Sequence, residues 1–365
     1  MIPVNTPLLS GNELEYVSEC IKTNWISSEG PFINKFEEGF SNYIGMQHGI
    51  AVANGSAALD IAIKALNISN GDEVIMPTFT IISPAQSIVT NGAIPVLVDA
   101  NPNTWNIDVN LIEEKITPKT KAILVVHIYG LPTEMQPIVD LCKKYNLLLI
   151  EDAAEMHGQT YNGKMCGSFG DISIFSFYPN KHITTGEGGM LLTNNEELAE
   201  KCRYYRNLCF EKNGRRFVHH DIGWNYRMTN LQAALGVAQL EKIETHIHKK
   251  REIGNLYNKQ LATLKNFQLP LEKTSYAENI YWIYGLVASN EELANETIEK
   301  LAKQKIGTRP FFWCMHEQPV FLKMGLFKNE QYPIAEKIAR NGFYIPSGLG
   351  ITEKEINEVC NALLL

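Results

Sequence analysis

The chain has 365 residues, of which 45% are hydrophobic and only 20% are charged. This composition supports a large buried core and excludes an intrinsically disordered protein. The length predicts two domains, or one large domain that carries a smaller one. The formal net charge of -7 excludes a general polyanion binder, because such proteins collect Lys and Arg to neutralise phosphates, so we expect no nucleic acid partner.

The N-terminal stretch has no basic region followed by an apolar core, and no apolar run approaches the roughly 20 residues needed to cross a bilayer. We therefore expect a soluble, cytoplasmic protein without a membrane partner. The seven cysteines are odd in number and lack CxxC spacing. They predict reduced thiols, with neither a disulfide framework nor a metal site.

Helices are expected first near residues 11–21 and 32–43. From about residue 50 to 195, short apolar runs alternate with segments of helical period. The expected helices begin at Ser56, follow Pro84, and lie near 109–116 and 134–145. The expected strands are 73–76, 94–98, 122–126, 147–150, 172–177 and 190–193. This alternation indicates an α/β fold with a mostly parallel sheet between helices.

Residues 228–247 have the pattern of one long helix with an apolar face. After it come expected helices near 249–264, 297–304 and 353–364, around an apolar run at 280–287. We therefore predict a large α/β domain over residues 1–245, including the N-terminal helices, and a small C-terminal α+β domain over residues 246–365.

A carboxylate lies at the end of one predicted strand, where LLLIEDAAEMHG places Asp152. Open α/β sheets bind ligands at the carboxyl ends of their strands, so Asp152 is a candidate site residue. The alternative is that Asp152 only caps the following segment.

A lysine follows the next apolar strand, where FSFYPNK places Lys181 before the Gly-rich ITTGEGG. A lysine in this position can be desolvated, which lowers its pKa and makes it a nucleophile for a Schiff base. The alternative is a solvated surface lysine, which the flanking sequence disfavours.

Small residues and an aromatic complete the pattern. Gly55 and Ser56 lie at the start of a predicted helix, where backbone N–H groups and the helix dipole favour a phosphate, although many helices begin in this way for capping alone. Phe79 follows another strand and would either stack on a flat ring or belong to the core. Together with Asp152 and Lys181, these residues supply what pyridoxal phosphate (PLP) requires: a phosphate seat, a ring contact, a partner for the ring nitrogen and an amine for the aldehyde.

The motifs NGSAAL, EDAAE, FSFYPNK and ITTGEGG, followed by GWNYRMTNLQAALGVAQLEKI, resemble those of the PLP-dependent nucleotide-sugar aminotransferases of fold type I (DegT/DnrJ/StrS type) over nearly the whole chain. The resemblance implies that Lys181 bonds to the cofactor aldehyde and moves protons, that Asp152 pairs with the pyridine nitrogen, and that Phe79 stacks on the ring. The other cofactor contacts that it implies are Gly55, Ser56 and Ser176 at the phosphate and Glu155 near the ring oxygen.

The resemblance also implies how the cofactor cycles and how the chains assemble. PLP would alternate with pyridoxamine phosphate (PMP), and two chains would form a homodimer with shared active sites, which can pair further into a tetramer. Asn225 would reach the partner's cofactor phosphate, the alternative being a turn residue. The candidate substrate contacts are Trp25, Ser27, His182, Arg309 and His316, for which a structural role is an equal alternative.

The implied reaction moves the amino group of L-glutamate to the C4 ketone of a nucleotide-linked 4-keto-6-deoxyhexose for surface-glycan synthesis. Through the motifs VVHIYGLPTEMQPI and RPFFWCMH, the resemblance further implies GDP-4-keto-6-deoxymannose as acceptor and GDP-perosamine as product. A dTDP- or UDP-linked sugar is an alternative.

Two further alternatives stay open. Pro179 and His182 around the lysine resemble the PLP/PMP-dependent sugar 3-dehydratases, which replace the lysine itself by His, whereas Lys181 is present here. His182 would then act as a second proton carrier or only fill space. The last alternative is a regulator that keeps the cofactor without catalysis, which the acidic charge balance disfavours.

Overall fold

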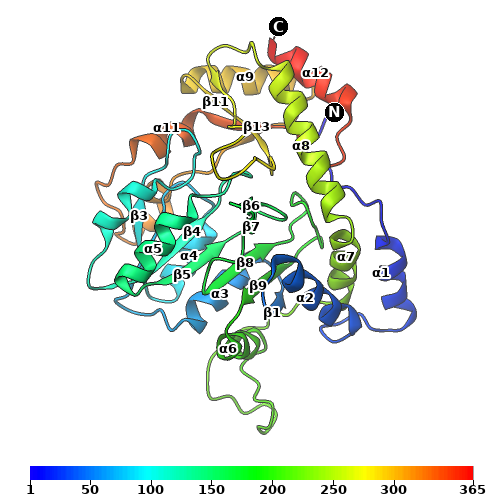
Figure 1. Ribbon diagram of the computed structural model, residues 1–365, viewed down its shortest axis with the longest axis vertical. Coiled ribbons are helices and arrows are strands. Elements are labelled where there is room, and N and C mark those ends of the chain that lie inside the picture. Colours follow the sequence, from blue (N-terminus) through cyan, green and yellow to red (C-terminus); the bar gives the residue numbers. More distant parts are fainter. Residues whose placement is uncertain (365) are drawn as a thin grey trace.

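The computed structural model describes residues 1–364 and shows a central sheet with helices on both faces (Figure 1). The order of its seven strands is β1-β9-β8-β5-β4-β2-β3. These strands are β1 (His48–Val52), β2 (Glu73–Pro77), β3 (Ile94–Val98), β4 (Thr120–Val126), β5 (Leu148–Asp152), β8 (Ile172–Ser176) and β9 (Gly189–Thr193). All neighbours from β8 to β3 are parallel, whereas β9 is antiparallel to β1 and β8. The predicted α/β fold with a mostly parallel sheet is confirmed.

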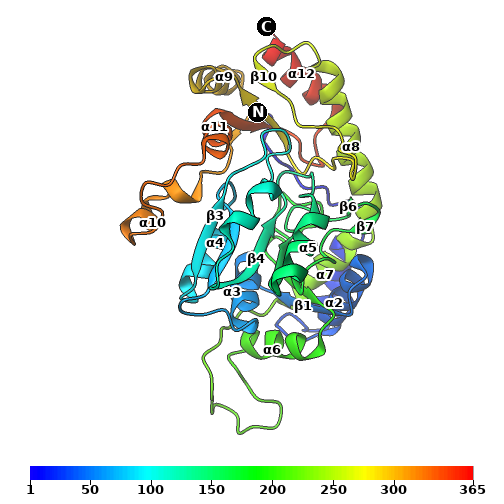
Figure 2. The ribbon, with the colours of Figure 1, turned by 60° about the vertical axis from the view of Figure 1, so that its left-hand side comes forward.

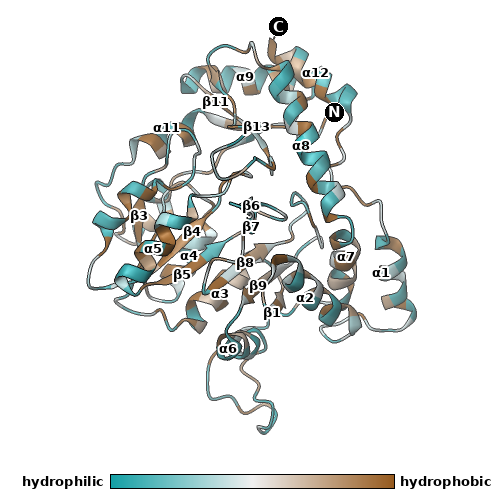
Figure 3. Ribbon diagram, viewed as in Figure 1, coloured by the Kyte–Doolittle hydropathy of each residue, from teal (hydrophilic) through white to brown (hydrophobic). Residues whose placement is uncertain are grey.

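Side chains along each strand alternate between two cores on opposite faces of the sheet. In β2, Val74 and Met76 join one core and Ile75 joins the other. The first core lies under α3 (Gly55–Ala65), α4 (Ser83–Thr90) and α6 (Glu196–Arg206), and the second under α2 (Pro31–Ile44), α5 (Met135–Tyr145) and α7 (Asn230–Leu240), with α1 (Glu13–Lys22) packed on α7. Figure 3 shows brown segments concentrated in the sheet and teal on the outer helices. A parallel sheet covered on both faces in this way exposes its strand ends for binding.

A second unit follows, built on an antiparallel sheet of order β10-β11-β13-β12. Its elements are β10 (Phe267–Gln268), β11 (Tyr284–Ala288), β12 (Arg309–Pro310), β13 (Gly342–Ile345), α9 (Glu291–Lys303), α10 (Pro319–Lys323), α11 (Pro333–Asn341) and α12 (Glu353–Leu364). Helix α8 (Ile243–Gln260) runs from α7 to α12 and joins this unit to the first (Figure 1). The boundary predicted between residues 245 and 246 lies in the first turn of α8 and stays a prediction.

The start of the chain lies against the second unit. Ile2 forms a bridge with Ile306 and belongs to the core of that unit. Asn5 then donates a hydrogen bond from Nδ2 to the carbonyl oxygen of Pro179, at 3.0 Å. The first residues therefore connect the second unit to the loop that precedes Lys181.

Two predicted helices differ from the structure. Residues 228–247 form two helices, because α7 begins only after the cap Thr229 and packs on α2, and the chain then turns at Lys242 so that α8 packs on α12. Residues 109–116 form two 3₁₀ turns, Val109–Leu111 and Glu113–Lys115. Pro118 follows closely and disfavours helical geometry at the residue before it, so the segment does not continue as an α-helix.

Two features emerge that the sequence did not predict. A short hairpin, β6 (Thr160–Tyr161) and β7 (Lys164–Met165), follows β5. Residues 207–229 form an arm that projects beyond α6 (Figures 1 and 2), and its apolar side chains Phe217 and Ile222 are 74% and 87% exposed. Among residues 1–364, none of the helices combines the length and apolar character that a bilayer span requires.

Candidate active site

The carboxyl ends of two neighbouring strands meet the start of a helix. Asp152 is the last residue of β5 and Ser176 the last of β8, and these strands pair in parallel. Gly55 is the first residue of α3, and a Cβ there would lie 2.9 Å from the Ser176 Cβ, so only glycine permits this approach. Asn54 caps α3 by accepting a hydrogen bond from the Ala57 N–H at 2.8 Å. The other N–H groups of the first turn stay available to an anion.

Lys181 extends from the turn after β8, where its N–H donates to the Tyr178 carbonyl at 2.9 Å. Its Nζ lies 3.9 Å from Glu155 Oε1 and 3.8 Å from the centre of the Trp282 ring. Burial lowers the pKa of Lys181, and the negative charges of Glu155 and Asp152 oppose this shift. The structure thus places a desolvated amine beside two carboxyl groups.

The two carboxyl groups are both buried but are held differently. Burial raises the pKa of Asp152 to about 6, against the opposing effects of a 3.1 Å hydrogen bond from the Ala154 N–H and of the Lys181 charge. Burial also raises the pKa of Glu155, whose Oε2 accepts a 2.6 Å hydrogen bond from the Tyr129 N–H. Both side chains are therefore fixed near the lysine amine.

These groups surround one cavity of about 530 Å³. The sequence-predicted residues that line it are Gly55, Ser56, Asp152, Glu155, Ser176 and Lys181. The structure brings these six side chains and backbone groups together; their individual roles stay predictions.

Phe79 does not reach the cavity. It is fully buried and packs against Tyr129 and Phe312, with ring centres 5.9 and 6.2 Å apart. Its loop turns that ring into the core and instead presents Ile81, which is 47% exposed and lines the cavity. The ring contact expected of Phe79 stays a prediction, and Ile81 is the side chain of this loop that lines the cavity.

The two predicted histidines are also buried away from the cavity lining. His182 Nδ1 lies 3.3 Å from the His157 carbonyl oxygen, and burial holds its pKa well below the usual range. His316 lies 2.8 Å from the Thr78 hydroxyl and 3.1 Å from Glu336. Both rings are held inside the fold by these contacts, and the substrate contacts expected of His182 and His316 stay predictions.

Three more predicted residues lie outside the cavity. Trp25 and Ser27 are exposed, and their carbonyl oxygens accept hydrogen bonds from Asn230 at 2.8 and 2.6 Å. Asn225 is exposed at the base of the arm and accepts two hydrogen bonds from Arg227, at 3.0 and 2.7 Å. Within one chain none of the three lines the cavity.

A second hollow of about 600 Å³ lies beside α6 and the arm. Arg227 and Ser28 line it, next to the predicted residues Asn225 and Ser27. It shares no lining residue with the lysine cavity. We treat the smaller cavity as the reaction site, because it holds the desolvated amine and the strand ends.

The second unit supplies cavity residues that the sequence did not predict. Trp282, Phe312 and Tyr344 line the cavity more than 100 residues after Lys181. Phe312 belongs to the motif RPFFWCMH, whereas no local motif marks Trp282 or Tyr344. Exposed Arg309 lies beside Tyr344 in the β12–β13 pair, at the edge of this lining. Thr80 also lines the cavity, and adjacent Phe79 was the only signal for it.

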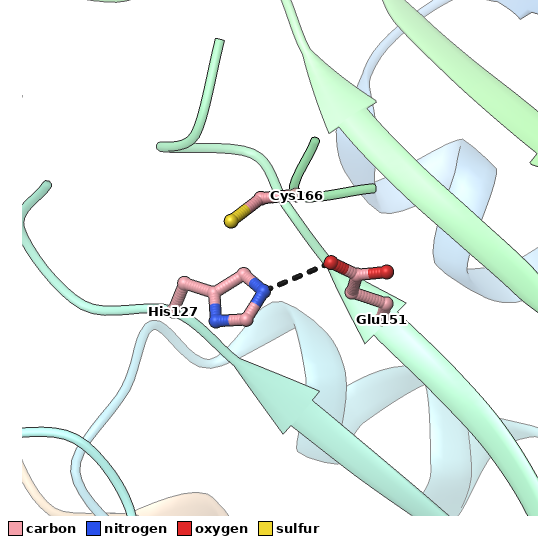
Figure 4. Close-up of side chains that lie close together, drawn as sticks. All are labelled: His127, Glu151 and Cys166. Carbon is pink, nitrogen blue, oxygen red and sulfur yellow. Dashed lines mark hydrogen bonds and ion pairs between the residues drawn. The ribbon is translucent and has the colours of Figure 1, made fainter. Parts of the chain in front are cut away.

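A buried cluster of His127, Glu151 and Cys166 lies next to Asp152 (Figure 4). The Thr133 N–H donates to His127 Nδ1 at 3.1 Å, so the ring proton is on Nε2, which donates to Glu151 at 3.0 Å. Both ring nitrogens are thus occupied, and burial raises the pKa of the Cys166 thiol well above its usual value. Since metal ligation needs a free imidazole nitrogen and a thiolate, the cluster acts as a hydrogen-bond network between β4 and β5.

Comparisons with known proteins agree with this geometry. The chain matches the model of the DegT/DnrJ/EryC1/StrS aminotransferase family over residues 7–364. It is 42% identical to GDP-perosamine synthase of Escherichia coli O157:H7, with 99% of this chain and 97% of the relative covered. Its fold is similar to that of the aminotransferase TlmJ from Streptoalloteichus hindustanus, with TM-score 0.93, 26% identity and coverage of 100% and 98%. NtdA from Bacillus subtilis with bound cofactor PMP gives TM-score 0.88, 29% identity and coverage of 99% and 85%. With a buried lysine at the strand ends of a matching fold, the chain belongs to the DegT/DnrJ/EryC1/StrS aminotransferase family.

Proposed function

We propose that this enzyme moves the amino group of L-glutamate, through PLP that cycles with PMP, to the C4 ketone of GDP-4-keto-6-deoxymannose and so makes GDP-perosamine. The observation that carries the proposal is the Lys181 amine, which lies 3.9 Å from Glu155 in a cavity that Asp152 also lines. The likeness to GDP-perosamine synthase over 99% of the chain supports the choice of acceptor.

The cavity fits a pyridoxal phosphate. Gly55 and Ser56 offer the N-terminus of α3 to the phosphate, and Ser176 adds a hydroxyl. Thr80 lines the same cavity, and its buried hydroxyl has no hydrogen-bond partner within the described part of the chain, so it can bond to a ligand. Ile81 offers an aliphatic side chain to the face of the ring.

Bound PLP supplies an electron sink and accepts and returns the amino group. Asp152 holds a proton on the ring nitrogen, and the Ala154 N–H keeps its carboxylate in place. Lys181 moves protons through Nζ, because burial favours its neutral form, and the Glu155 carboxyl lies 3.9 Å from this amine. Asp152 thus keeps the ring nitrogen positively charged, and Lys181 is the acid–base group.

We further propose a homodimer in which the arm of one chain completes the site of the other. The arm projects from the rest of the chain (Figure 2). Its apolar residues Phe217, Val218 and Ile222 are exposed within one chain, as a contact with a second copy would explain. Asn225 and Arg227 at the base of this arm would then face the partner's cofactor phosphate. All cysteines of the described residues are free, which agrees with a reducing compartment, and we place the enzyme in the cytoplasm.

The test is incubation with PLP, 15N-labelled L-glutamate and, in separate tubes, GDP-, dTDP- and UDP-4-keto-6-deoxyhexoses, followed by mass spectrometry of the sugar. We expect 15N only in the GDP sugar. Label in a dTDP or UDP sugar would keep the aminotransferase and change the acceptor, and loss of the C3 oxygen without label would indicate a 3-dehydratase. Lys181→Ala should lower turnover about a thousandfold or more and remove the borohydride-reducible chromophore.

A further inference from the structure

Trp282 comes from the second unit, two residues before β11, yet its ring forms a wall of the cavity. The Lys181 Nζ lies over the face of this ring, 3.8 Å from its centre. The Trp282 side chain is buried, with 5% exposed. An ammonium is attracted to the negative face of an indole, and this attraction is strongest where water is excluded.

The indole is held from several directions. Its Nε1–H donates to the carbonyl oxygen of Asn180, the residue before Lys181, at 2.9 Å. Its own carbonyl oxygen accepts a hydrogen bond from Lys250 Nζ at 3.1 Å. The Tyr129 ring packs beside it, with centres 5.9 Å apart and planes inclined by 30°. The ring is therefore tied both to the loop that carries Lys181 and to α8.

A lysine side chain has four flexible bonds and loses much rotamer freedom when it is fixed in one position. Glu155 attracts the Lys181 amine from one side, but at 3.9 Å it holds the ammonium only loosely. The Trp282 face adds attraction without a group that can take the proton. The amine thus lies between a proton acceptor and an inert surface.

We infer that Trp282 is a positioning residue for Lys181, whose indole face holds the lysine amine at a defined place in the cavity whenever that amine is not bonded to the cofactor. This inference rests on the role proposed above for Lys181. It predicts that the ring matters for proton movement by the free amine and not for holding L-glutamate or the sugar.

The matched variants are Trp282→Leu, which removes the aromatic face and the N–H, and Trp282→Phe, which keeps a smaller ring face and loses the bond to Asn180. Trp105→Phe is the control. Trp105 is equally buried and also packs near Tyr129, but it does not line the cavity, and its indole N–H has no partner in the described residues.

The first measurement uses cofactor-free protein and does not depend on the reaction. Cyanate carbamoylates neutral amines, so its rate at Lys181, followed by peptide mass spectrometry across pH, reports the titration of that amine. We expect Trp282→Leu to lower the titration midpoint by about one pH unit, because the ring favours the ammonium. Trp282→Phe should give an intermediate midpoint, and Trp105→Phe should match wild type.

The second measurement is kinetic. With PLP loaded, Trp282→Leu should lower kcat about tenfold, leave KM for L-glutamate within about twofold, and shift the pH profile of kcat; Trp282→Phe should recover part of the loss. An unchanged midpoint in Trp282→Leu, or changes equal to those of Trp105→Phe, would overturn the inference. If leucine prevents folding, the same comparison of Trp282→Phe with the control decides it. Failure of the proposed function would show instead as wild-type protein that forms no reducible chromophore with PLP.

Discussion

Lys250 donates a hydrogen bond from Nζ to the carbonyl oxygen of Trp282, at 3.1 Å, and another to the carbonyl of Ser347. The lysine is 2% exposed and forms no ion pair among the described residues. Burial alone lowers its pKa from 10.5 to about 7. A buried amine of α8 therefore joins two segments of the second unit without a counterion.

This arrangement predicts how stability depends on pH. Between about pH 7 and 10.5 the unfolded lysine keeps its proton while the folded one loses it, so the folded state gains stability as pH rises. The free energy of unfolding of wild type, relative to Lys250→Met, should rise by about 1.4 kcal/mol per pH unit in this window. Urea unfolding at pH 7, 8 and 9 measures it, with Lys249→Met as the control. A difference that does not change with pH would contradict the prediction.

The Asp152 carboxyl should lower the stability of the cofactor-free protein at neutral pH while it supports turnover. The folded carboxyl keeps its proton up to about pH 6 and the unfolded one only to 3.8, so stability falls as pH rises through this window. Above pH 6 the full cost remains, about 3 kcal/mol at 1.36 kcal/mol per pH unit. Cofactor-free Asp152→Asn should therefore be more stable than wild type at pH 8, and equal near pH 4. With PLP it should lose most turnover, because Asn cannot keep the ring nitrogen protonated. Denaturant unfolding that shows a less stable variant at pH 8 would contradict this.

Glu151 should act through stability and not through a metal. Its buried carboxylate accepts hydrogen bonds from His127, from the backbone N–H groups of residues 167, 169 and 170, and from Ser173. Glu151→Ala should destabilise the protein by about 3–5 kcal/mol, because these donors lose their acceptor. Cys166→Ala should cost much less, about 1 kcal/mol. Chelator treatment should leave activity unchanged, and a bound metal found by elemental analysis would refute the interpretation.

Mixing two inactive variants tests the shared site. Lys181→Ala disables a chain's own cavity, whereas Asn225→Ala would disable the partner's. Equal amounts, mixed and allowed to exchange subunits, form one intact site in each mixed dimer, so about a quarter of wild-type activity should return. If light scattering shows dimers but the mixture is as inactive as each variant alone, Asn225 acts in the site of its own chain. Lys181→Ala mixed with Asp152→Asn should show no recovery, because both defects lie in the same chain's cavity.

The site residues that the sequence predicted lie at the ends of helices and strands. Gly55, Asp152 and Ser176 meet because parallel strands carry their carboxyl ends to one edge of the sheet. The sequence could not tell which residue of the loop after β2 would face the cavity, since Phe79 and Ile81 both follow the strand and only packing decides between them. Trp282 and Tyr344 carry no local signal, because their place depends on how the second unit docks.

The hydrogen bond from Trp282 to Asn180 spans 102 residues, and that from Asn5 to Pro179 spans 174. The loop of Lys181 is therefore held by two regions of the chain that are far from it in sequence. During synthesis, β8, which precedes Lys181, is complete long before Trp282, whose ring contacts the lysine amine, has been added. A chain interrupted before residue 282 would contain Lys181, Asp152 and the phosphate seat, and would still lack the wall that holds the amine. Capture of the cofactor in its working geometry is thus a late step, which follows the docking of the second unit.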